Sequence, residues 1–342
     1  MNRIFYQFTF IFLSLLFICY GVFHPLFESA QSCTFDGNEM TIDYHIVVNM
    51  AQKDEEKVKE IIANTFQEID RIYNKWNPNS EISRINRLEA YETISLSLQL
   101  EYFLRLTEKM VEQSEGRFDP TVEPLQKIWK DHLERGIIPS QERIDEILPA
   151  IGWKNIHFGK GKIFKDQSKT SLDFGGIAKG HCVDLIVEKI VAAGFNDVLV
   201  EWGGEIRVHG RQSVERPWSV MVSGLDEMDS RSVIAQMSLD NQSIATSGDY
   251  IQNWSIQQDG YEVVYFHIID PRTAKPLEST SSSVASATVI APTCLMADAL
   301  AKAAIMHSSF SAAKEWVDEM NRRNPDIKFL LFSREEGSYS SF

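Results

Sequence analysis

The stretch Leu172-Asp173-Phe174-Gly175-Gly176-Ile177-Ala178-Lys179-Gly180 carries the densest pattern in the chain. A β-rich run over 171–174 meets two glycines, and an apolar run over 177–193 follows, which predicts a strand, a tight turn and a helix. Glycines allow a backbone to approach a phosphate closely, and a helix N-terminus presents N–H groups with partial positive charge. Lys179 adds a full charge. The spacing alone leaves two interpretations open, a phosphate site or a plain strand-to-helix turn.

The surrounding sequence predicts an α+β fold with mixed, largely antiparallel sheets packed with helices. Apolar residues at helical spacing predict helices over 54–73, 98–113, 140–147 and 293–307, and Ser80 and Ser140 stand where helix N-caps are expected. Short β-rich runs predict strands over 41–50, 156–158, 162–165, 171–174, 198–201, 206–210, 218–223, 233–238 and 284–290. These elements follow no regular βαβ rhythm, which is typical of the α+β class.

Composition excludes several classes of protein. The chain has 342 residues, of which 44% are hydrophobic and 24% charged, as in a folded globular protein of one or two domains. The formal net charge is -14, whereas nucleic-acid binders usually carry a basic surface, so we expect no nucleic-acid partner. Since an acidic protein repels a diphosphate, a nucleotide site needs a local lysine or metal. The four cysteines form no CxxC pair, which argues against a zinc site.

The N-terminus begins with an uncharged stretch of 20 residues, Ile4–Phe23, preceded by Arg3. Twenty helical residues span a bilayer core, and a basic start before an apolar run is typical of an export signal or an uncleaved anchor. We therefore assign 1–25 to a signal peptide or membrane anchor, 26–40 to a linker and 41–342 to the folded domain. A small residue precedes Cys33, as lipoprotein processing prefers, so a lipidated N-terminus and a plain signal-anchor both stay open.

Three further segments carry residues suited to chemistry. Gly203-Gly204 separates two predicted strands and is either a site of close approach or a plain turn. His267 lies near Asp270, so the pair could supply a general base, although such pairs are also common in structural roles. Asp298 and Lys302 are four residues apart on a predicted helix and share a face. They form a surface ion pair or, because Ala, Leu and Met surround them, a buried carboxylate with its cation.

Taken in order, these segments resemble the ApbE family, the FAD:protein FMN transferases, over roughly residues 35–310. Two stretches match family motifs closely: 76–86 reads W-N-P-N-S-E-I-S-R-I-N, and 116–125 reads G-R-F-D-P-T-V-E-P-L. Weaker matches follow in family order at 173–180, 203–204, 246–250, 267–273 and 297–298. The resemblance implies an ApbE/T-fold-like arrangement of antiparallel sheets and helices.

The resemblance also implies which residues form the site. The residues expected to contact FAD are Met40, Trp76, Arg117, Phe118, Asp119, Asp173, Lys179 and Ile269. The family's magnesium ion takes a backbone carbonyl and side chains of the late helix, which correspond here to Gly176, Asp298 and Lys302. His267 corresponds to the histidine proposed as the catalytic base, and we expect Asp270 to orient it.

The chain departs from the family pattern at three places. The Met-Gly-Thr signature reads Met40-Thr41-Ile42, and the D-P-x-T-G turn has Ala274 in place of glycine. The family's metal-binding threonine is replaced by Lys302, and a charged lysine has no lone pair for a metal. Two hypotheses follow. Lys302 supplies part of the charge that a metal gives elsewhere, or it points away and the metal binds more weakly through Asp298, carbonyls and phosphates.

The implied activity is attachment of FMN from FAD, through a phosphoester, to a Ser or Thr of a target flavoprotein, with release of AMP. Two alternatives stay open: an FAD pyrophosphatase that yields FMN and AMP, and a non-catalytic membrane-tethered flavin-binding protein. By family analogy, the acceptors are flavoprotein subunits of membrane redox complexes, such as the sodium-pumping NADH:quinone reductase. With the N-terminal segment as signal or anchor, we expect the protein on the periplasmic (extracytoplasmic) side of the cell inner membrane.

Overall fold

The computed structural model describes residues 31–223, 233–249, 252–258 and 260–341. The apolar stretch Ile4–Phe23, expected to be a signal or anchor, lies outside the described residues, as does Tyr250 of the 246–250 motif. Within the described ranges, no helix is both long and apolar enough to cross a bilayer.

Helices and strands are mixed along the chain, as expected for an α+β protein. The helices are α2 (Glu55–Tyr73), α3 (Glu81–Asn86), α4 (Leu98–Gln113), α5 (Glu123–Leu133), α6 (Gln141–Asp145), α7 (Ala178–Ala192), α8 (Cys294–Ile305) and α9 (Phe310–Arg323). Short 3-10 helices lie at Gln52–Asp54, Pro120–Val122, Leu148–Ala150 and Trp153–Asn155. The strands are β1 (Gln31–Glu39), β2 (Ile42–Met50), β3 (Ile94–Ser95), β4 (Ile156–Gly159), β5 (Lys162–Lys165), β6 (Val198–Trp202), β7 (Glu205–His209), β8 (Trp218–Ser223), β9 (Val233–Leu239), β10 (Ser243–Gly248), β11 (Asn253–Gln258), β12 (Tyr261–Asp270), β13 (Lys275–Glu278), β14 (Ser286–Ala291), β15 (Lys328–Ser333) and β16 (Gly337–Ser340).

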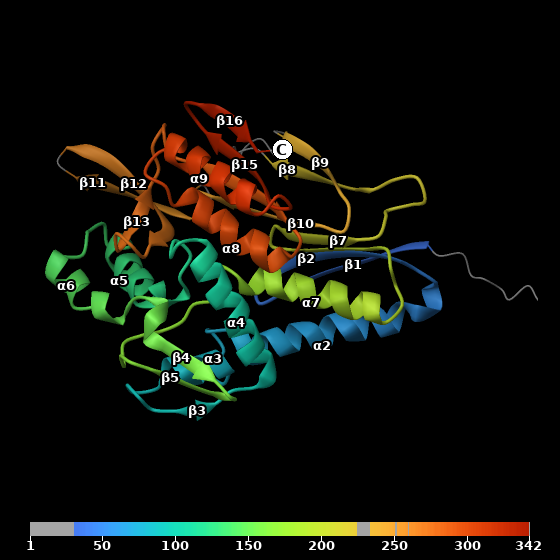
Figure 1. Ribbon diagram of the computed structural model, residues 1–342, viewed down its shortest axis with the longest axis horizontal. Helices are drawn as coiled ribbons and strands as arrows, with labels where there is room; N and C mark the ends of the chain where they lie inside the picture. The colour runs from blue at the N-terminus through green and yellow to red at the C-terminus, as the bar shows by residue number, and fades with distance from the viewer. Residues whose placement is uncertain (1–30, 224–232, 250–251, 259, 342) are drawn as a thin grey trace, which may run out of the picture.

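The central element is an eight-stranded antiparallel sheet with the order β1-β2-β6-β7-β10-β14-β15-β16 among the described strands. Helices α2, α7, α8 and α9 form a layer over one face of this sheet, as Figure 1 shows. Helix α8 contacts β10 and β14, and its alanines 297, 301, 303 and 304 are fully buried there. A helix that is apolar on nearly all sides is typical of a protein core, so a polar residue on α8 is placed in the interior.

The opposite face of the sheet is covered by the β8–β9 hairpin. Trp218, Val220 and Leu239 of the hairpin pack with Val208 and Ile244 of the sheet. Two smaller sheets, β11-β12-β13 and β3-β5-β4, complete the fold. The first of them packs against α5 in a separate apolar cluster, and its strand β12 brings the histidine motif toward the helices.

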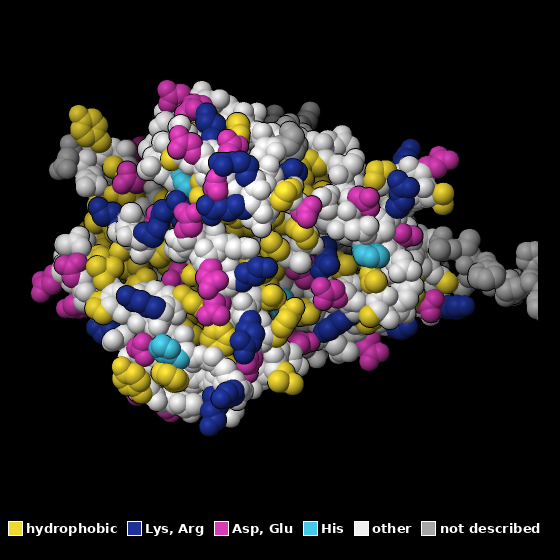
Figure 2. Space-filling view, viewed as in Figure 1, with side chains coloured by type: hydrophobic (Ala, Val, Ile, Leu, Met, Phe, Trp, Pro, Cys, Tyr) yellow, Lys and Arg dark blue, Asp and Glu magenta, His cyan; other side chains and the backbone are white. Residues whose placement is uncertain are grey.

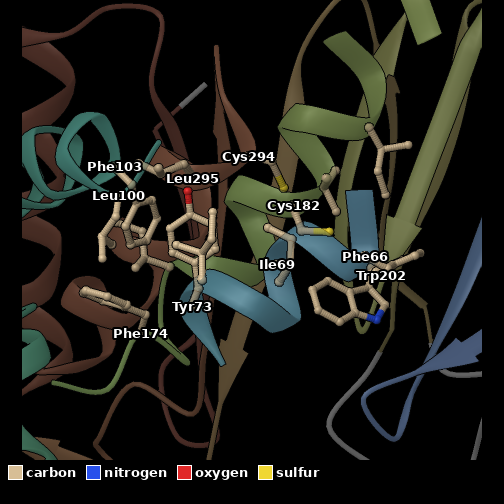
Figure 3. Packing of buried hydrophobic residues seen from close by; sticks show 14 of the residues in the cluster. Phe66, Ile69, Tyr73, Leu100, Phe103, Phe174, Cys182, Trp202, Cys294 and Leu295 are labelled. Carbon is tan, nitrogen blue, oxygen red and sulfur yellow. The ribbon is translucent and has the colours of Figure 1, made fainter. Parts of the chain in front are cut away.

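A large apolar cluster joins α2, α4 and α7 (Figure 3). The ring of Tyr73 lies 4.6 Å from that of Phe103, measured between centroids. Phe103 in turn meets Phe174 edge-to-face at 4.8 Å, an arrangement that aromatic pairs prefer. Because Phe174 precedes the glycine pair directly, this packing fixes where the turn before α7 begins.

Helices α7 and α8 are locked together by two residues of α7. Gly180 lies so close to α8 that a Cβ added to it would be 2.3 Å from the carbonyl oxygen of Cys294. The carboxylate of Asp184 accepts the backbone N–H groups of Cys294 and Leu295 at 2.8 and 2.9 Å, and it pairs with Arg207 at 2.8 Å. An acidic group at a helix N-terminus satisfies otherwise unpaired donors there. The start of α8 is therefore positioned directly by α7.

Most predicted elements are present, and two predictions are wrong. Residues 31–39, assigned to the linker, form β1, which pairs with β2 along its whole length. The strand was not predicted because it lies at the edge of the sheet and its solvated face carries polar residues. Residues 171–174 form no regular strand. There the side chain of Asn86 accepts the N–H of Leu172 and donates to its carbonyl at 2.8 and 2.9 Å, and so takes the place of a neighbouring strand.

Candidate functional site

Two cavities that share residues lie where the turn before α7, the end of α8, α5 and strand β12 meet. The smaller has a volume of about 180 Å³ and the larger about 540 Å³. Four residues line both of them: Gln126, Asp173, His267 and Ile269. Ligand sites in proteins are typically concave and mostly apolar, with a few placed polar groups, and this pair of cavities has that character.

The cavities bring together most of the residues predicted for the site. The smaller one is lined by Arg117, Phe118, Asp119, Asp173, Gly176, His267, Ile269 and Lys302. Trp76 lines the larger one, where 78% of its surface is exposed. Of the remaining predicted residues, Met40, Lys179, Asp270 and Asp298 line neither cavity.

The turn over Gly175 and Gly176 forms one wall of the smaller cavity. Asp173 fixes this turn, because its carboxylate accepts the N–H of Gly175 at 2.8 Å. The other oxygen of Asp173 accepts from Lys75 at 3.0 Å, and the Lys75 ammonium lies 4.9 Å above the Trp76 ring. Lys75 was not predicted from the sequence, because nothing in its local pattern points to an aspartate 98 positions away.

Behind the turn lies a cluster of four charged side chains, in which buried Glu205 and Asp298 pair with half-buried Lys179 and Lys302. Lys179 pairs with Glu205 and donates to the carbonyl of Gly203 at 3.2 Å, so the second glycine pair is brought next to α7. Burial opposes the charge on Lys179, but the carboxylates of Glu205 and Asp298 outweigh it and raise the pKa of Lys179. Glu205 directly follows the Gly203–Gly204 pair and was not predicted as a site residue.

Asp298 is fully buried, and both of its oxygens have donors. One accepts the N–H of Gly180 at 3.1 Å, and the other pairs with Lys302. The surface ion pair that spacing left open is therefore wrong, and the buried carboxylate with its cation is correct. Lys302 does not point away either, since it pairs with Asp298 and its side chain lines the smaller cavity.

Arg117 and Asp119 line the smaller cavity but differ in what they offer a ligand. Asp119 caps a 3-10 helix through Thr121 and accepts the N–H of Trp153 at 2.9 Å. Burial nevertheless raises the pKa of Asp119. Since its oxygens are bound internally, Asp119 shapes the cavity wall. Arg117 pairs with Glu115 at 2.8 Å, while its buried Nε has no partner among the described residues, so Arg117 brings a cation to the cavity wall.

His267 lies on β12 and lines both cavities. Its Nδ1 is buried and has no hydrogen-bond partner among the described residues. Burial, followed by the nearby charge of Lys302, lowers the pKa of His267 from its ordinary value of 6.5. The imidazole is therefore neutral at pH 7, which is the form that accepts a proton.

Asp270 does not orient His267, contrary to expectation. Its two oxygens accept the guanidinium of Arg272 at 2.9 and 2.6 Å, and one of them also accepts the N–H of Arg272 at 2.9 Å. His267 lines both cavities, whereas Asp270 lines neither and its carboxylate is bound within the turn that follows β12. Arg272, which also donates to the carbonyl of Met306 at 2.9 Å, holds that turn against the end of α8.

Met40 lies in the tight turn between β1 and β2, outside the cavities. Met40 and Thr41 both have positive φ, at 51° and 67°, a conformation that glycine adopts most easily. The family pattern has glycine at the second of these positions, and this chain makes the turn with Thr41 there instead. Neighbouring Ile42 contacts the 203–204 turn, since a Cβ on Gly203 would lie 2.7 Å from its methyl group.

The residues at the position of the family's magnesium ion do not fit that ion as they stand. No group of three or more His, Cys, Asp or Glu side chains that could hold a metal occurs among the described residues. Asp298 is paired with Lys302, and Lys302 has no lone pair while charged. Magnesium prefers six oxygen ligands in near-octahedral geometry, and here one of the expected ligands is itself a cation.

The fold and cavity define the class of protein: an α+β protein whose cavity combines a glycine turn at a helix N-terminus, a lysine and a neutral histidine, suited to a phosphate-bearing ligand. A model of the ApbE family matches residues 40–328, and the chain belongs to that family.

Named relatives and solved structures agree with this membership. The chain is 35% identical over 295 residues to an FAD:protein FMN transferase of Chlamydia pneumoniae, covering 85% of this chain and 90% of the relative. It is 29% identical over 278 residues to an FAD:protein FMN transferase of Vibrio cholerae, covering 80% and 81%. The ApbE protein of Thermotoga maritima superposes with a TM-score of 0.78 at 26% identity, covering 91% of this chain and 97% of that one. The flavin transferase ApbE from Vibrio cholerae gives 0.76 at 25% identity, covering 91% and 96%.

Proposed function

We propose that this chain is a transferase that moves FMN from FAD to a protein, an FAD:protein FMN transferase. The observation that carries the proposal is one cavity in which the Gly175–Gly176 turn, Lys302 and the neutral imidazole of His267 face the same space. A cation and backbone groups suit a diphosphate, and a neutral histidine suits an incoming hydroxyl. The family membership and the names of the relatives support the same activity.

The reaction needs one bond to form and one to break at phosphorus. The hydroxyl oxygen of an acceptor Ser or Thr bonds to the phosphorus on the FMN side of the FAD diphosphate. The bond from that phosphorus to the bridging oxygen breaks, and AMP leaves with the electron pair. The hydroxyl proton passes to His267. Such transfer depends on positioning and on neutralising charge in the transition state.

The remaining cavity residues are suited to holding the substrate. Apolar Phe118 and Ile269 and the exposed ring of Trp76 offer flat contact surfaces to the ring systems of FAD. Arg117 adds a positive charge to the wall of the smaller cavity. Asp173 keeps the glycine turn in place by accepting the N–H of Gly175, and a phosphate bound at this turn would lie at the N-terminal end of α7.

Location and acceptors form part of the same proposal. The uncharged stretch Ile4–Phe23 is suited to an export signal or anchor, which would put the enzyme on the periplasmic side of the inner membrane. Acceptors there would be flavoprotein subunits of membrane redox complexes. On the face seen in Figure 2, Lys and Arg side chains lie interspersed with Asp and Glu, a mixed distribution that is typical of protein surfaces and identifies no particular acceptor.

The test separates the transferase from the two alternative functions. The purified chain is incubated with FAD and the soluble domain of the flavin-carrying subunit of a sodium-pumping NADH:quinone reductase, and both acceptor mass and AMP are followed. A gain equal to FMN minus water, with equimolar AMP, supports the transferase. AMP without a mass gain indicates a pyrophosphatase, and bound FAD without AMP indicates a carrier. Replacing the acceptor hydroxyl by alanine is the control, and should abolish the mass gain.

A further inference from the structure

The four charged side chains of the cluster beside the cavity balance one another without any added ion. Glu205 and Asp298 supply two negative charges, and Lys179 and Lys302 supply two positive ones. The side chains of the two acids are only 3% and 0% exposed. Buried charges need partners, and removing one partner leaves a costly unpaired charge. A site with a neutral residue at position 302 would carry one net negative charge, which a bound cation would have to neutralise.

The side chain of Lys302 lies where a bound cation would have to lie to neutralise the cluster. Its methylene groups lie against Gly176, since a Cβ added to Gly176 would be 2.9 Å from Cδ of Lys302. Its ammonium pairs with Asp298, one turn earlier on α8, and the side chain lines the smaller cavity. Asp298 is itself fixed by the N–H of Gly180 at 3.1 Å. The ammonium is therefore anchored at a buried acid, and the side chain that carries it packs on the glycine turn and lines the cavity proposed for the diphosphate.

We propose that Lys302 replaces the divalent cation in this chain, so that its ammonium neutralises the FAD diphosphate and FMN transfer proceeds without a bound metal ion. This inference rests on the proposed function. A divalent ion at Asp298 would have to displace Lys302 and would leave the cluster with excess positive charge. A lysine can serve the same purpose, because it binds phosphate as a point charge in other nucleotide sites. The bonds formed and broken are unchanged, and Lys302 stays protonated throughout.

The first measurement needs no turnover. Mn²⁺ is titrated into the FAD-free protein, and free Mn²⁺ is counted by electron paramagnetic resonance. Wild type should leave Mn²⁺ free, whereas Lys302→Thr, which restores an oxygen ligand and removes the competing charge, should bind one equivalent. Lys59→Thr is the matched control, because Lys59 forms an exposed pair with Glu55 at the same four-residue spacing and 2.7 Å. This control should behave as wild type does.

The second measurement follows FMN transfer in EDTA and in Mg²⁺. Wild type should transfer at the same rate in both. Lys302→Thr should lose about 10²-fold in EDTA, the usual cost of removing one preorganised charge-stabilising group, and recover in Mg²⁺. Tight Mn²⁺ binding by wild type, or loss of wild-type transfer in EDTA, would overturn the inference even if the variant failed to fold. Absence of transfer in every condition would count against the proposed function instead, and the Mn²⁺ titration would still decide whether Lys302 excludes the ion.

Discussion

Replacing Gly180 with alanine tests the contact that positions α8 and its buried charges. The added Cβ would lie 2.3 Å from the carbonyl oxygen of Cys294 and 2.8 Å from the backbone nitrogen of Leu295. Ordinary contacts begin near 3.4 Å, so α8 would have to retreat by about 1 Å. These are backbone atoms at the start of a helix that packs against the central sheet, and they cannot yield as a flexible side chain would.

Whether Gly180→Ala lowers or raises the stability of the protein tests the close contact between α7 and α8. A glycine in an uncrowded helix interior gains roughly 0.5–1 kcal/mol on replacement by alanine. Overpacking costs ~1–3 kcal/mol, so we expect Gly180→Ala to lose roughly 1–2 kcal/mol net. For a large domain each kcal/mol lowers Tm by about 2–4 °C. FMN transfer should fall as well, because the 3.1 Å bond from Gly180 to Asp298 lengthens.

The assay is urea denaturation with a matched variant on the same helix. Ala192 is exposed near the end of α7, so Ala192→Gly measures helix propensity without a clash. We expect both variants to be less stable than wild type. If Gly180→Ala were instead more stable, by as much as Ala192→Gly loses, the close contact between α7 and α8 would be refuted.

Three further outcomes are expected at the histidine motif. His267→Ala should slow FMN transfer by about 10²–10⁴-fold while FAD binding, followed by flavin fluorescence, is kept; a normal rate would dismiss its role as base. Because burial and the charge of Lys302 lower the pKa of His267 from 6.5, the midpoint of the acidic decline in the wild-type rate should lie below pH 6.5. A midpoint above pH 6.5 would contradict the buried imidazole beside Lys302. Asp270→Asn should leave the acidic decline of the pH–rate profile where it is, because Asp270 binds Arg272. The variant should instead lower the stability of the protein by ~1–3 kcal/mol. A shift of the acidic decline would show that Asp270 does orient His267.

Local signals predicted the helices well. α4 has the predicted limits, and α2 begins one residue later than predicted, because an apolar stripe at helical spacing is preserved whatever it packs against. The predicted N-caps Ser80 and Ser140 both accept the backbone N–H three residues on. These features depend on neighbours in sequence, and so they can be predicted from sequence.

The ion-pair and strand-pairing partners that depend on the three-dimensional fold could not be predicted from the sequence. Asp270 has a histidine and an arginine within three positions, and only the direction of β12 decides that it binds Arg272. Lys179 was expected at the phosphates, but it pairs with Glu205 from the next strand pair. Strand β1 was missed for a similar reason, since its pairing with β2, rather than its composition, makes it a strand.

A crystal structure of the chain with FAD tests the central claim most directly. The diphosphate should lie against the Gly175–Gly176 turn within hydrogen-bonding distance of the Lys302 ammonium, with His267 facing the phosphorus on the FMN side. Flavin bound elsewhere, with the cavity of about 180 Å³ left without the diphosphate, would contradict it.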